Sequence, residues 1–173
     1  MRSEERRAAI LRDLRASAAP VSAAALAALY GVSRQIVVGD VALLRAAGEH
    51  ILATPRGYMM QQPAAGLVRQ VACRHRDEEM AAELYAVTDA GCAVLDVVVE
   101  HPLYGQLTGA LQLHCRADVD AFLRRCASAD ARPLSELTGG THLHTLSCPD
   151  DAAFERARRA LRALGFLLEG AGD

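Results

Sequence analysis

Apolar residues recur at helical spacing near the start of the chain. A first stripe, within residues 3–16, consists of Ala9, Ile10, Leu11 and Leu14. Ser22 precedes a second apolar segment, Ala23–Tyr30, and Ser33 precedes a third segment that runs to about Ala47. Serine is a favoured N-cap because its oxygen accepts from the free N–H groups of a first helical turn. The pattern therefore predicts three helices.

Two short strand-like segments follow the predicted helices. They are Ile51–Thr54 and Gly57–Met60, joined by a turn that contains proline. A hairpin after three helices is typical of a winged helix-turn-helix. Residues 61–66 are polar and turn-prone, which is typical of a linker. We therefore expect a DNA-binding domain over residues 1–62 and a second domain over residues 67–173.

The second part of the chain alternates short strands with helices. Strands are predicted at Leu67–Arg74, Ala93–Glu100, Leu107–Leu113, Thr141–Ser147 and Phe166–Leu168. Helices are predicted from Asp77 to about Val87, at Asp118–Ala127 and at Asp151–Leu164. This order predicts an α/β sandwich with a mostly antiparallel sheet, covered on one face. The predicted fold class is α+β, with the winged helix-turn-helix first.

The turn between the second and third helices carries the residues expected to meet DNA. Gly31 suits a tight turn, and the helix after it is the one that enters the major groove in this motif. Ser33, Arg34 and Gln35 occupy its beginning; arginine pairs well with guanine and glutamine with adenine. Arg56, at the hairpin tip, is placed to reach the DNA backbone or minor groove. The alternative is a three-helix packing domain that binds no DNA.

Two residues inside this recognition helix conflict with its role. Gly39 should cost about 1 kcal/mol relative to alanine, so packing must compensate or the helix is locally soft. Asp40 adds a negative charge near DNA, and we therefore expect its side chain to point away from the DNA-facing surface.

Charge and composition add to this division. Residues 1–62 hold eight arginines against five acidic residues, whereas residues 63–173 hold eleven against sixteen. A basic segment joined to an acidic one suggests a DNA-facing module attached to a domain with another task. The chain is 51% hydrophobic, enough for real cores, but its longest apolar runs are far shorter than a membrane span. The first residues lack the apolar core of a signal peptide, so we expect a cytoplasmic protein without membrane contact.

The five cysteines indicate no disulfide framework. They are scattered, odd in number and contain no CxxC pair. We therefore expect a reducing compartment, with most of them serving as small buried apolar residues.

Four polar residues in the second part have the chemistry of a metal site. His142 and His144 are two apart on a predicted strand, so their side chains leave the same face. His75 ends another strand, and Glu83 lies in the helix that follows it. Three imidazoles and one carboxylate suit Zn, Ni, Fe or Co rather than Ca or Mg. The alternative to a metal site is a polar sheet face with solvated imidazoles.

A further histidine, His101, either lines a pocket or only completes a turn.

Taken together, these segments resemble a known family. The stretch Ala25–Gly48, with its hairpin, resembles the helix-turn-helix of biotin-repressor-like regulators. The remainder resembles the three-histidine (3H) domain of niacin-responsive repressors of NAD biosynthesis. The supporting motifs are His75 with Glu83 eight residues later, His101-Pro102-Leu103-Tyr104-Gly105, and Gly139-Gly140-Thr141-His142-Leu143-His144. The resemblance spans essentially the whole chain.

The resemblance implies a function and a set of site residues. It implies that His75, Glu83, His142 and His144 hold a divalent metal, with Ni or Zn expected. It also implies nicotinic acid as co-repressor, operator DNA as partner and a homodimer as functional unit. We expect His101, Tyr104 and Gly105 to contribute to effector binding.

Three rival functions fit parts of the pattern. A small metalloenzyme uses similar ligands with an open position for water, but the basic helix-turn-helix argues against an enzyme. A pure metal sensor would respond to the ion itself. A phosphocarrier-like domain would use histidine as phosphoacceptor, although the His142–His144 spacing favours chelation.

Overall fold

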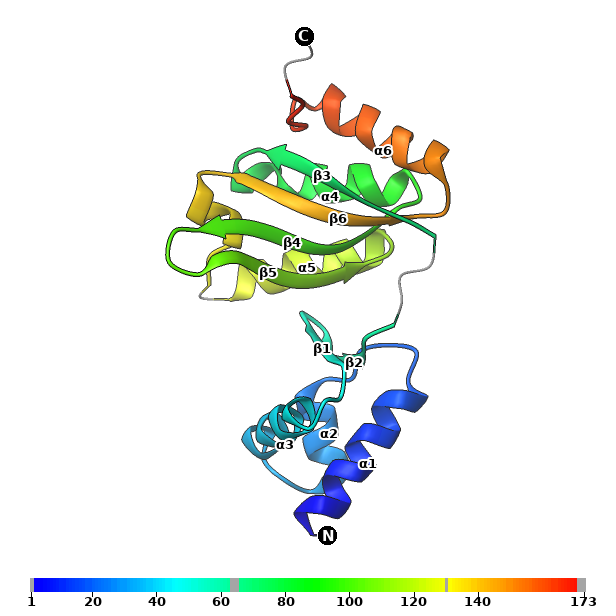
Figure 1. Cartoon of the computed structure of the whole chain (residues 1–173), viewed down its shortest axis with the longest axis vertical. Helices are drawn as coiled ribbons and strands as arrows, with labels where there is room; N and C mark the ends of the chain where they lie inside the picture. Colours follow the sequence, from blue (N-terminus) through cyan, green and yellow to red (C-terminus); the bar gives the residue numbers. More distant parts are fainter. Residues whose placement is uncertain (1, 63–65, 130, 171–173) are drawn as a thin grey trace. The chain divides into compact units, whose positions relative to one another are not determined.

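A computed structural model describes residues 2–62, 66–129 and 131–170 of the chain. Their contacts separate into two units, Met1–Pro63 and Ala64–Asp173 (Figure 1). Part of the predicted linker, residues 63–65, lies outside the described residues. No single helix of the described chain is long and apolar enough to cross a membrane. The helices α2 (Ala23–Tyr30) and α3 (Arg34–Ala46) meet the length and composition criteria only as a pair, which is bent by 105° at the turn between them.

The first unit is a winged helix-turn-helix, as predicted. Its elements are α1 (Ser3–Ala16), α2 (Ala23–Tyr30), α3 (Arg34–Ala46), β1 (Ile51–Thr54) and β2 (Gly57–Met60). Both predicted serine caps are present: Ser22 accepts from the N–H of Ala25, and Ser33 accepts from the N–H of Ile36. Gly31 ends α2 in the left-handed conformation, with φ of 64°.

A small apolar core and a docked hairpin hold this unit together. Its buried members are Ile10, Leu14, Leu26, Ala27, Val37, Val41, Leu44 and Ile51. The hairpin is fixed to the segment before α2, because Val21 and Tyr58 exchange two backbone hydrogen bonds of 2.8 and 2.9 Å. A Cβ on Gly57 would lie 2.4 Å from the carbonyl oxygen of Val21, so only glycine allows this approach.

The structure answers both questions about the recognition helix α3. Asp40 points away from the exposed face, as expected: it is 4% exposed, and its Oδ2 accepts from Nε of Arg6 on α1 at 2.6 Å. Gly39 is exposed, and a Cβ there would meet no atom within 4 Å. Packing at Gly39 itself therefore does not compensate for its cost. The buried side of α3, which includes Val37 and Val41, stabilises the helix instead.

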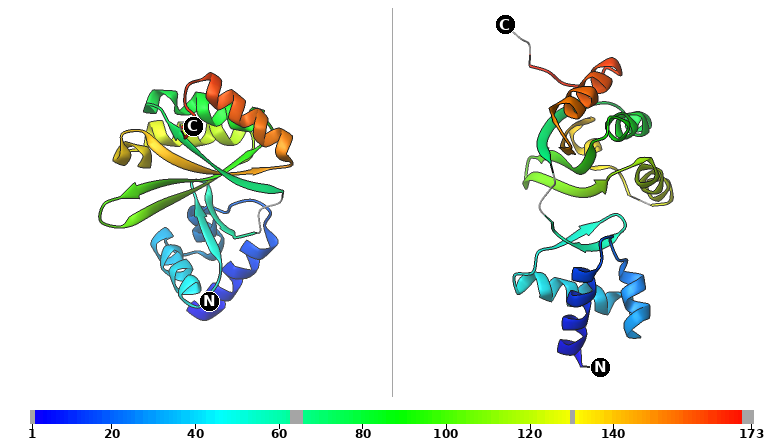
Figure 2. Two further views of the ribbon diagram at one scale, coloured as in Figure 1. Left: turned by 45° about the horizontal axis from the view of Figure 1, so that its top comes forward. Right: turned by 90° about the vertical axis from the view of Figure 1, so that its right-hand side faces the viewer.

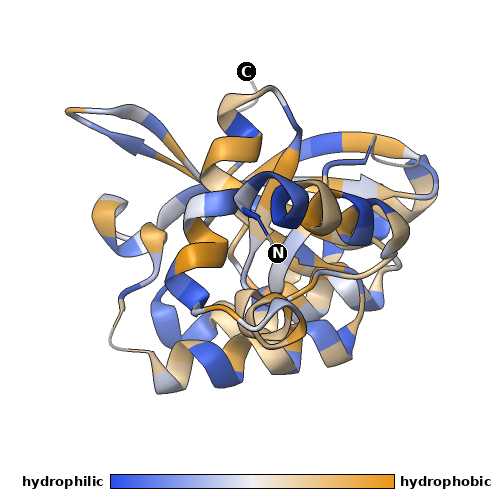
Figure 3. Ribbon diagram, turned by 90° about the horizontal axis from the view of Figure 1, so that it is seen from below, coloured by the Kyte–Doolittle hydropathy of each residue, from blue (hydrophilic) through white to orange (hydrophobic). Residues whose placement is uncertain are grey.

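The second unit is a four-stranded antiparallel sheet with helices on one face. The strands are β3 (Leu67–Arg74), β4 (Ala93–His101), β5 (Gly105–Leu113) and β6 (Thr141–Cys148), in the order β3-β6-β4-β5. The helices α4 (Met80–Asp89), α5 (Arg116–Ser128) and α6 (Asp151–Ala163) cover one face (Figure 2, right). Hydrophobic and hydrophilic residues alternate along the helices of the chain, as amphipathic packing requires (Figure 3).

Three details of this unit differ from the sequence prediction. His101 and Gly105 are paired strand residues and not part of the turn, because the β4–β5 ladder continues to them. Short 3-10 helices occur at Asp77–Glu79 (η1) and Leu134–Thr138 (η2). Phe166–Leu168 is not a full strand, since only Leu167 forms an isolated bridge, to Cys73.

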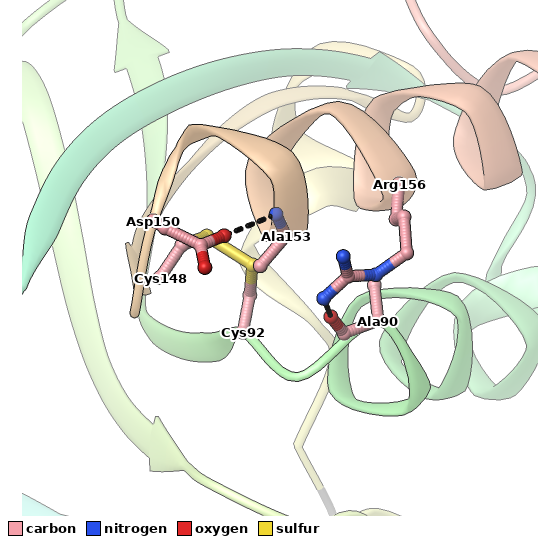
Figure 4. Close-up of a disulfide and its surroundings, with 6 residues drawn as sticks. All are labelled: Ala90, Cys92, Cys148, Asp150, Ala153 and Arg156. Carbon is pink, nitrogen blue, oxygen red and sulfur yellow. Dashed lines mark hydrogen bonds between the residues drawn. A yellow bond between two sulfur atoms is a disulfide. The ribbon is translucent and has the colours of Figure 1, made fainter.

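The expectation of no disulfide was wrong for one pair of cysteines. Cys92, which directly precedes β4, and Cys148, the last residue of β6, form a disulfide close to the N-terminus of α6 (Figure 4). Ala93 pairs with Ser147 in the sheet, so the next positions, Cys92 and Cys148, face each other. Fifty-six residues separate them in sequence, which hides this proximity. Cys73, Cys115 and Cys126 are free.

We predict that reducing this disulfide lowers the stability of the second unit. The bond closes a loop that contains β4, β5, α5, η2 and β6. Loop-closure entropy for a ring of this size corresponds to as much as about 4 kcal/mol. Urea denaturation with and without a dithiol reductant measures the difference. Cys115→Ser is the control, because that cysteine is free and exposed; an unchanged unfolding midpoint on reduction would contradict the prediction.

Candidate functional site

The four predicted metal-ligating residues converge in the second unit. In the β3–β6 ladder His142 lies opposite Cys73 and His144 lies opposite Val71, on the face covered by the helices. His75 follows the end of β3, and Glu83 lies in the first turn of α4. All four residues are buried, and Glu83 is only 1% exposed. The alternative of solvated imidazoles on a polar sheet face is therefore wrong.

The carboxylate of Glu83 is the centre of this cluster. Its Oε2 lies 2.6 Å from Nε2 of His75 and 3.2 Å from Nε2 of His144. Its Oε1 lies 3.0 Å from Nε2 of His142. The rings of His75 and His142 meet edge to face, as do those of His142 and His144. One carboxylate thus faces three imidazole nitrogens of the same type.

The other nitrogen of each ring fixes its tautomer. Nδ1 of His75 lies 2.8 Å from the carbonyl oxygen of Arg76. Nδ1 of His142 lies 2.9 Å from that of Gly140, and Nδ1 of His144 lies 2.6 Å from that of Asp96. A carbonyl oxygen only accepts, so each Nδ1 carries the proton and donates it. In a neutral ring, Nε2 then presents a lone pair to the carboxylate of Glu83.

This arrangement requires positive charge between the rings and the carboxylate. Two acceptors at hydrogen-bonding distance repel each other unless a proton or a metal ion lies between them. Histidine ligands typically donate their second N–H to a carbonyl or carboxylate, which is the arrangement of all three rings here. One donor atom each from His75, Glu83 and His142 lies within 4.8 Å of the others. That group of three does not include His144, which contacts Glu83 directly. The residues present therefore fit a divalent transition metal.

The pKa shifts within the cluster also favour positive charge around the carboxylate of Glu83. Burial disfavours ionised Glu83, but the charge of His144 and the hydrogen bonds of the imidazoles outweigh it and hold the pKa of Glu83 well below its usual value. Burial also disfavours the charged form of His75 and His144. The hydrogen bond and charge of Glu83 outweigh this effect, so the pKa of each imidazole is raised. The cluster therefore favours a carboxylate surrounded by cations.

A glycine sets the approach of β6 to His75. Gly140 has φ of 93°, and a Cβ there would lie 2.2 Å from the carbonyl oxygen of His75. Its N–H donates to the carbonyl of Ser135 in η2 at 2.8 Å. Only glycine therefore allows this close approach at position 140, whereas at Gly139 a Cβ would meet nothing within 4 Å.

Cys73 belongs to this environment, which the sequence analysis did not recognise. It is fully buried, and burial together with the charge and hydrogen bond of Glu83 raises the pKa of its thiol. Its place two residues before His75, on the same face of β3, was the available signal.

The residues predicted to bind the effector lie at the tip of the β4–β5 hairpin and in the last strand pair before it. Nδ1 of His101 accepts from the N–H groups of Leu103 and Tyr104 at 3.1 and 3.3 Å, and the rings of His101 and Tyr104 stack. Gly105 pairs with His101. Among the described residues, no hydrogen bond, ion pair or ring contact joins these three to the histidine cluster. Their role in effector binding stays a prediction.

Of the residues predicted to bind DNA, three are exposed and Arg56 is half-buried. Ser33, Arg34 and Gln35 are exposed together at the start of α3. The oxygen of Ser33 caps that helix. Arg56 lies at the β1–β2 turn, where its backbone N–H donates to Oγ1 of Thr54 at 3.2 Å. The structure thus brings three of the four to one helix terminus and the fourth to the wing; their contacts with DNA stay predictions.

Known proteins resemble this chain over nearly its whole length. The family described as an HTH domain matches residues 6–59, and the 3H domain family matches residues 68–170. A protein of Thermotoga maritima named "Probable transcription repressor NiaR" is 43% identical over 96% of this chain and 95% of its own length. The "Transcription repressor NadR" of Bacillus subtilis is 40% identical over 95% of this chain and 93% of its own length.

These matches group the chain with DNA-binding regulators and not with enzymes. Each of the two predicted domains has a matching family, and each family covers one unit of the fold. The protein therefore belongs to the family of transcription repressors in which a helix-turn-helix domain precedes a 3H domain.

Proposed function

We propose that this protein is a metal-containing repressor that responds to nicotinic acid and binds operator DNA as a dimer. The observation that carries the proposal is the buried cluster in which three Nε2 atoms face the carboxylate of Glu83. In this proposal His75, Glu83, His142 and His144 hold one divalent ion, Ni or Zn. The niacin-responsive family that the sequence resembles supplies the identity of the effector.

The chemistry of nicotinic acid suits such a centre. It is a small planar anion with a pyridine nitrogen, and an ion that accepts a further ligand beyond its protein ligands can take that nitrogen directly. The chain's own residues orient the centre: the carbonyls of Arg76, Gly140 and Asp96 fix the three rings so that their Nε2 atoms converge. Co-repression then requires only that the effector bind the DNA-competent state more tightly.

The DNA-binding part of the proposal rests on α3 and the hairpin. In this proposal Arg34 and Gln35, in the exposed first turn of α3, read bases in the major groove. Ser33 contacts phosphate, and Arg56 reaches the DNA backbone or the minor groove. A dimer would place two such helices on one face of a near-palindromic operator.

The test is a DNA-shift titration of the full chain with nicotinic acid, with and without prior chelation. We expect nicotinic acid to tighten operator binding about 5- to 150-fold, the usual range of allosteric coupling, and only in the metal-loaded protein. His142→Ala should lose metal and the response to nicotinic acid, while its basal DNA binding remains.

Arg34→Ala is the matched control in the first unit. It should keep wild-type metal content and lose about 1–3 kcal/mol of binding energy for the operator. A chelated protein that responds as strongly as the loaded one would contradict the role of the metal. Tightening by the metal alone, with no further effect of nicotinic acid or nicotinamide, would instead support the pure metal sensor.

A second prediction separates the two neighbouring glycines. Gly140→Ala should abolish stoichiometric metal binding, because the new Cβ would overlap the carbonyl oxygen of His75 and push β6 away from it. Gly139→Ala pays a similar conformational cost of about 1–2 kcal/mol for positive φ but meets no atom, so it should keep its metal. Metal per chain, measured by atomic absorption, distinguishes them; equal metal content in both variants would show that the Gly140 contact does not position the site.

A further inference from the structure

The two edges of the sheet in the second unit differ. The last part of the β3 edge is covered by residues 166–168 of the chain: the N–H of Arg74 donates to the carbonyl of Phe166, and the N–H of Leu168 donates to the carbonyl of Ala72, both at 2.8 Å. At the other edge, β5 pairs with β4 on one side, and no described strand pairs with its outer side. The order β3-β6-β4-β5 therefore leaves one edge for a partner.

The residues of β5 do not protect that edge. Its sequence, Gly105 to Leu113, reads GQLTGALQL and contains no charged residue and no proline. Proteins usually prevent edge-to-edge pairing with charges, prolines or a covering segment. By contrast, β3 carries Arg69 and Arg74 in addition to its cover. An uncharged edge of this kind is suited to pairing with another strand.

The pattern of β5 is complementary to itself. Leu107 and Leu111 are equidistant from Gly109, and so are Thr108 and Ala110. Antiparallel pairing of two copies about a two-fold axis at Gly109 therefore sets Leu107 opposite Leu111 of the second copy. It likewise sets Thr108 opposite Ala110 of the second copy. A two-fold interface requires such a self-complementary surface. Gly109 itself is tightly packed, because a Cβ there would lie 3.2 Å from Cδ1 of Leu134.

The turn that leads into β5 adds apolar surface to the same edge. The β4–β5 ladder continues to His101 and Gly105, whereas the β4–β6 ladder ends at Val98, so the hairpin extends beyond β6 (Figure 2, left). At its tip Leu103 is 75% exposed and Tyr104 is 69% exposed. His101 holds the tip in shape through its contacts with both residues. A preformed apolar tip continuous with an open edge favours a protein partner.

We propose that two copies of this chain pair through β5, in antiparallel orientation about Gly109, and form one continuous sheet of two four-stranded halves. This inference rests on the dimer of the proposed function and names its surface. The tips of the two hairpins lie beyond the ends of the paired strands and cover the edges of the contact. Backbone hydrogen bonds set the register of the pairing, and the apolar residues of β5 exclude water from one face of it.

Charge substitutions at Thr108 test the interface in the full chain. Thr108 is exposed, and in the proposed pairing the two Thr108 side chains are diagonal neighbours across the axis. Thr108→Glu and Thr108→Lys should each raise the dimer dissociation constant about two- to fivefold, because like charges then approach each other. An equimolar mixture of the two variants should form heterodimers. Sedimentation equilibrium measures the association of the two variants and of their mixture. Thermal melting verifies that each variant is folded.

Gln70→Glu is the control, because Gln70 is exposed on the opposite edge strand β3. It should dimerise like the wild type. Leu103→Ser should weaken the dimer, because it removes an apolar side chain from the tip of the β4–β5 hairpin. A monomeric wild-type chain would overturn the proposal. So would a folded Thr108→Glu variant with wild-type dimerisation, or a mixture that forms no heterodimer. Metal content is measured on the same samples. A wild-type chain without bound metal would contradict the proposed metal centre, but the result for the dimer interface would still stand.

Discussion

A buried carboxylate must be neutralised, and the fold of the second unit is arranged around that requirement. Glu83 is held on α4 within the core, where an unpaired charge would be very costly. The end of β3 and the start of β6 supply the three imidazoles that surround it. Each ring is fixed by a different backbone carbonyl, so the positions of several segments depend on one small cluster. Gly140 is needed because β6 must come close to His75 for that cluster to form.

The same cluster is joined to the strand that lies beside the proposed dimer edge. Nδ1 of His144 donates to the carbonyl of Asp96, at the point where the β4 ladders shift register. Asp96 also accepts from the N–H of Thr145 through its side chain, and it pairs with Ala110 of β5. An ion that alters the position of His144 therefore acts on β4, and β5 follows through the ladder. If the effector binds at this centre as we propose, this connection would give it a short physical route to the proposed surface between two copies.

Local patterns were sufficient to predict most of the elements. Helical spacing and serine caps located the three helices of the first unit, and the orientation of Asp40 followed from its charge. The alternation of His142 and His144 correctly placed both side chains on one face. These features depend on residues that are close in sequence, where steric and capping rules apply directly.

Features that depend on the register of distant strands could not be predicted in this way. The Cys92–Cys148 disulfide needs the pairing of β4 with β6, and the position of Cys73 beside Glu83 needs the packing of α4 on β3. The end of β4 at His101 depends on its pairing with Gly105, which a proline at position 102 obscures in the sequence. The carbonyl partners of the three rings are backbone atoms and carry no sequence pattern at all.

The central claim is that a metal ion replaces protons between the imidazoles and Glu83. Calorimetric titration of chelated protein with Zn²⁺ or Ni²⁺, in buffers of different ionisation enthalpy, counts the ions bound and the protons released. Because Glu83 raises the pKa of His75 and of His144, these rings hold their protons more firmly than a free imidazole does, and they must lose them to bind metal. We expect one ion per chain, a proton release that decreases as the pH rises, and loss of binding in Glu83→Gln. Absence of binding, or binding to Glu83→Gln with unchanged affinity, would contradict it.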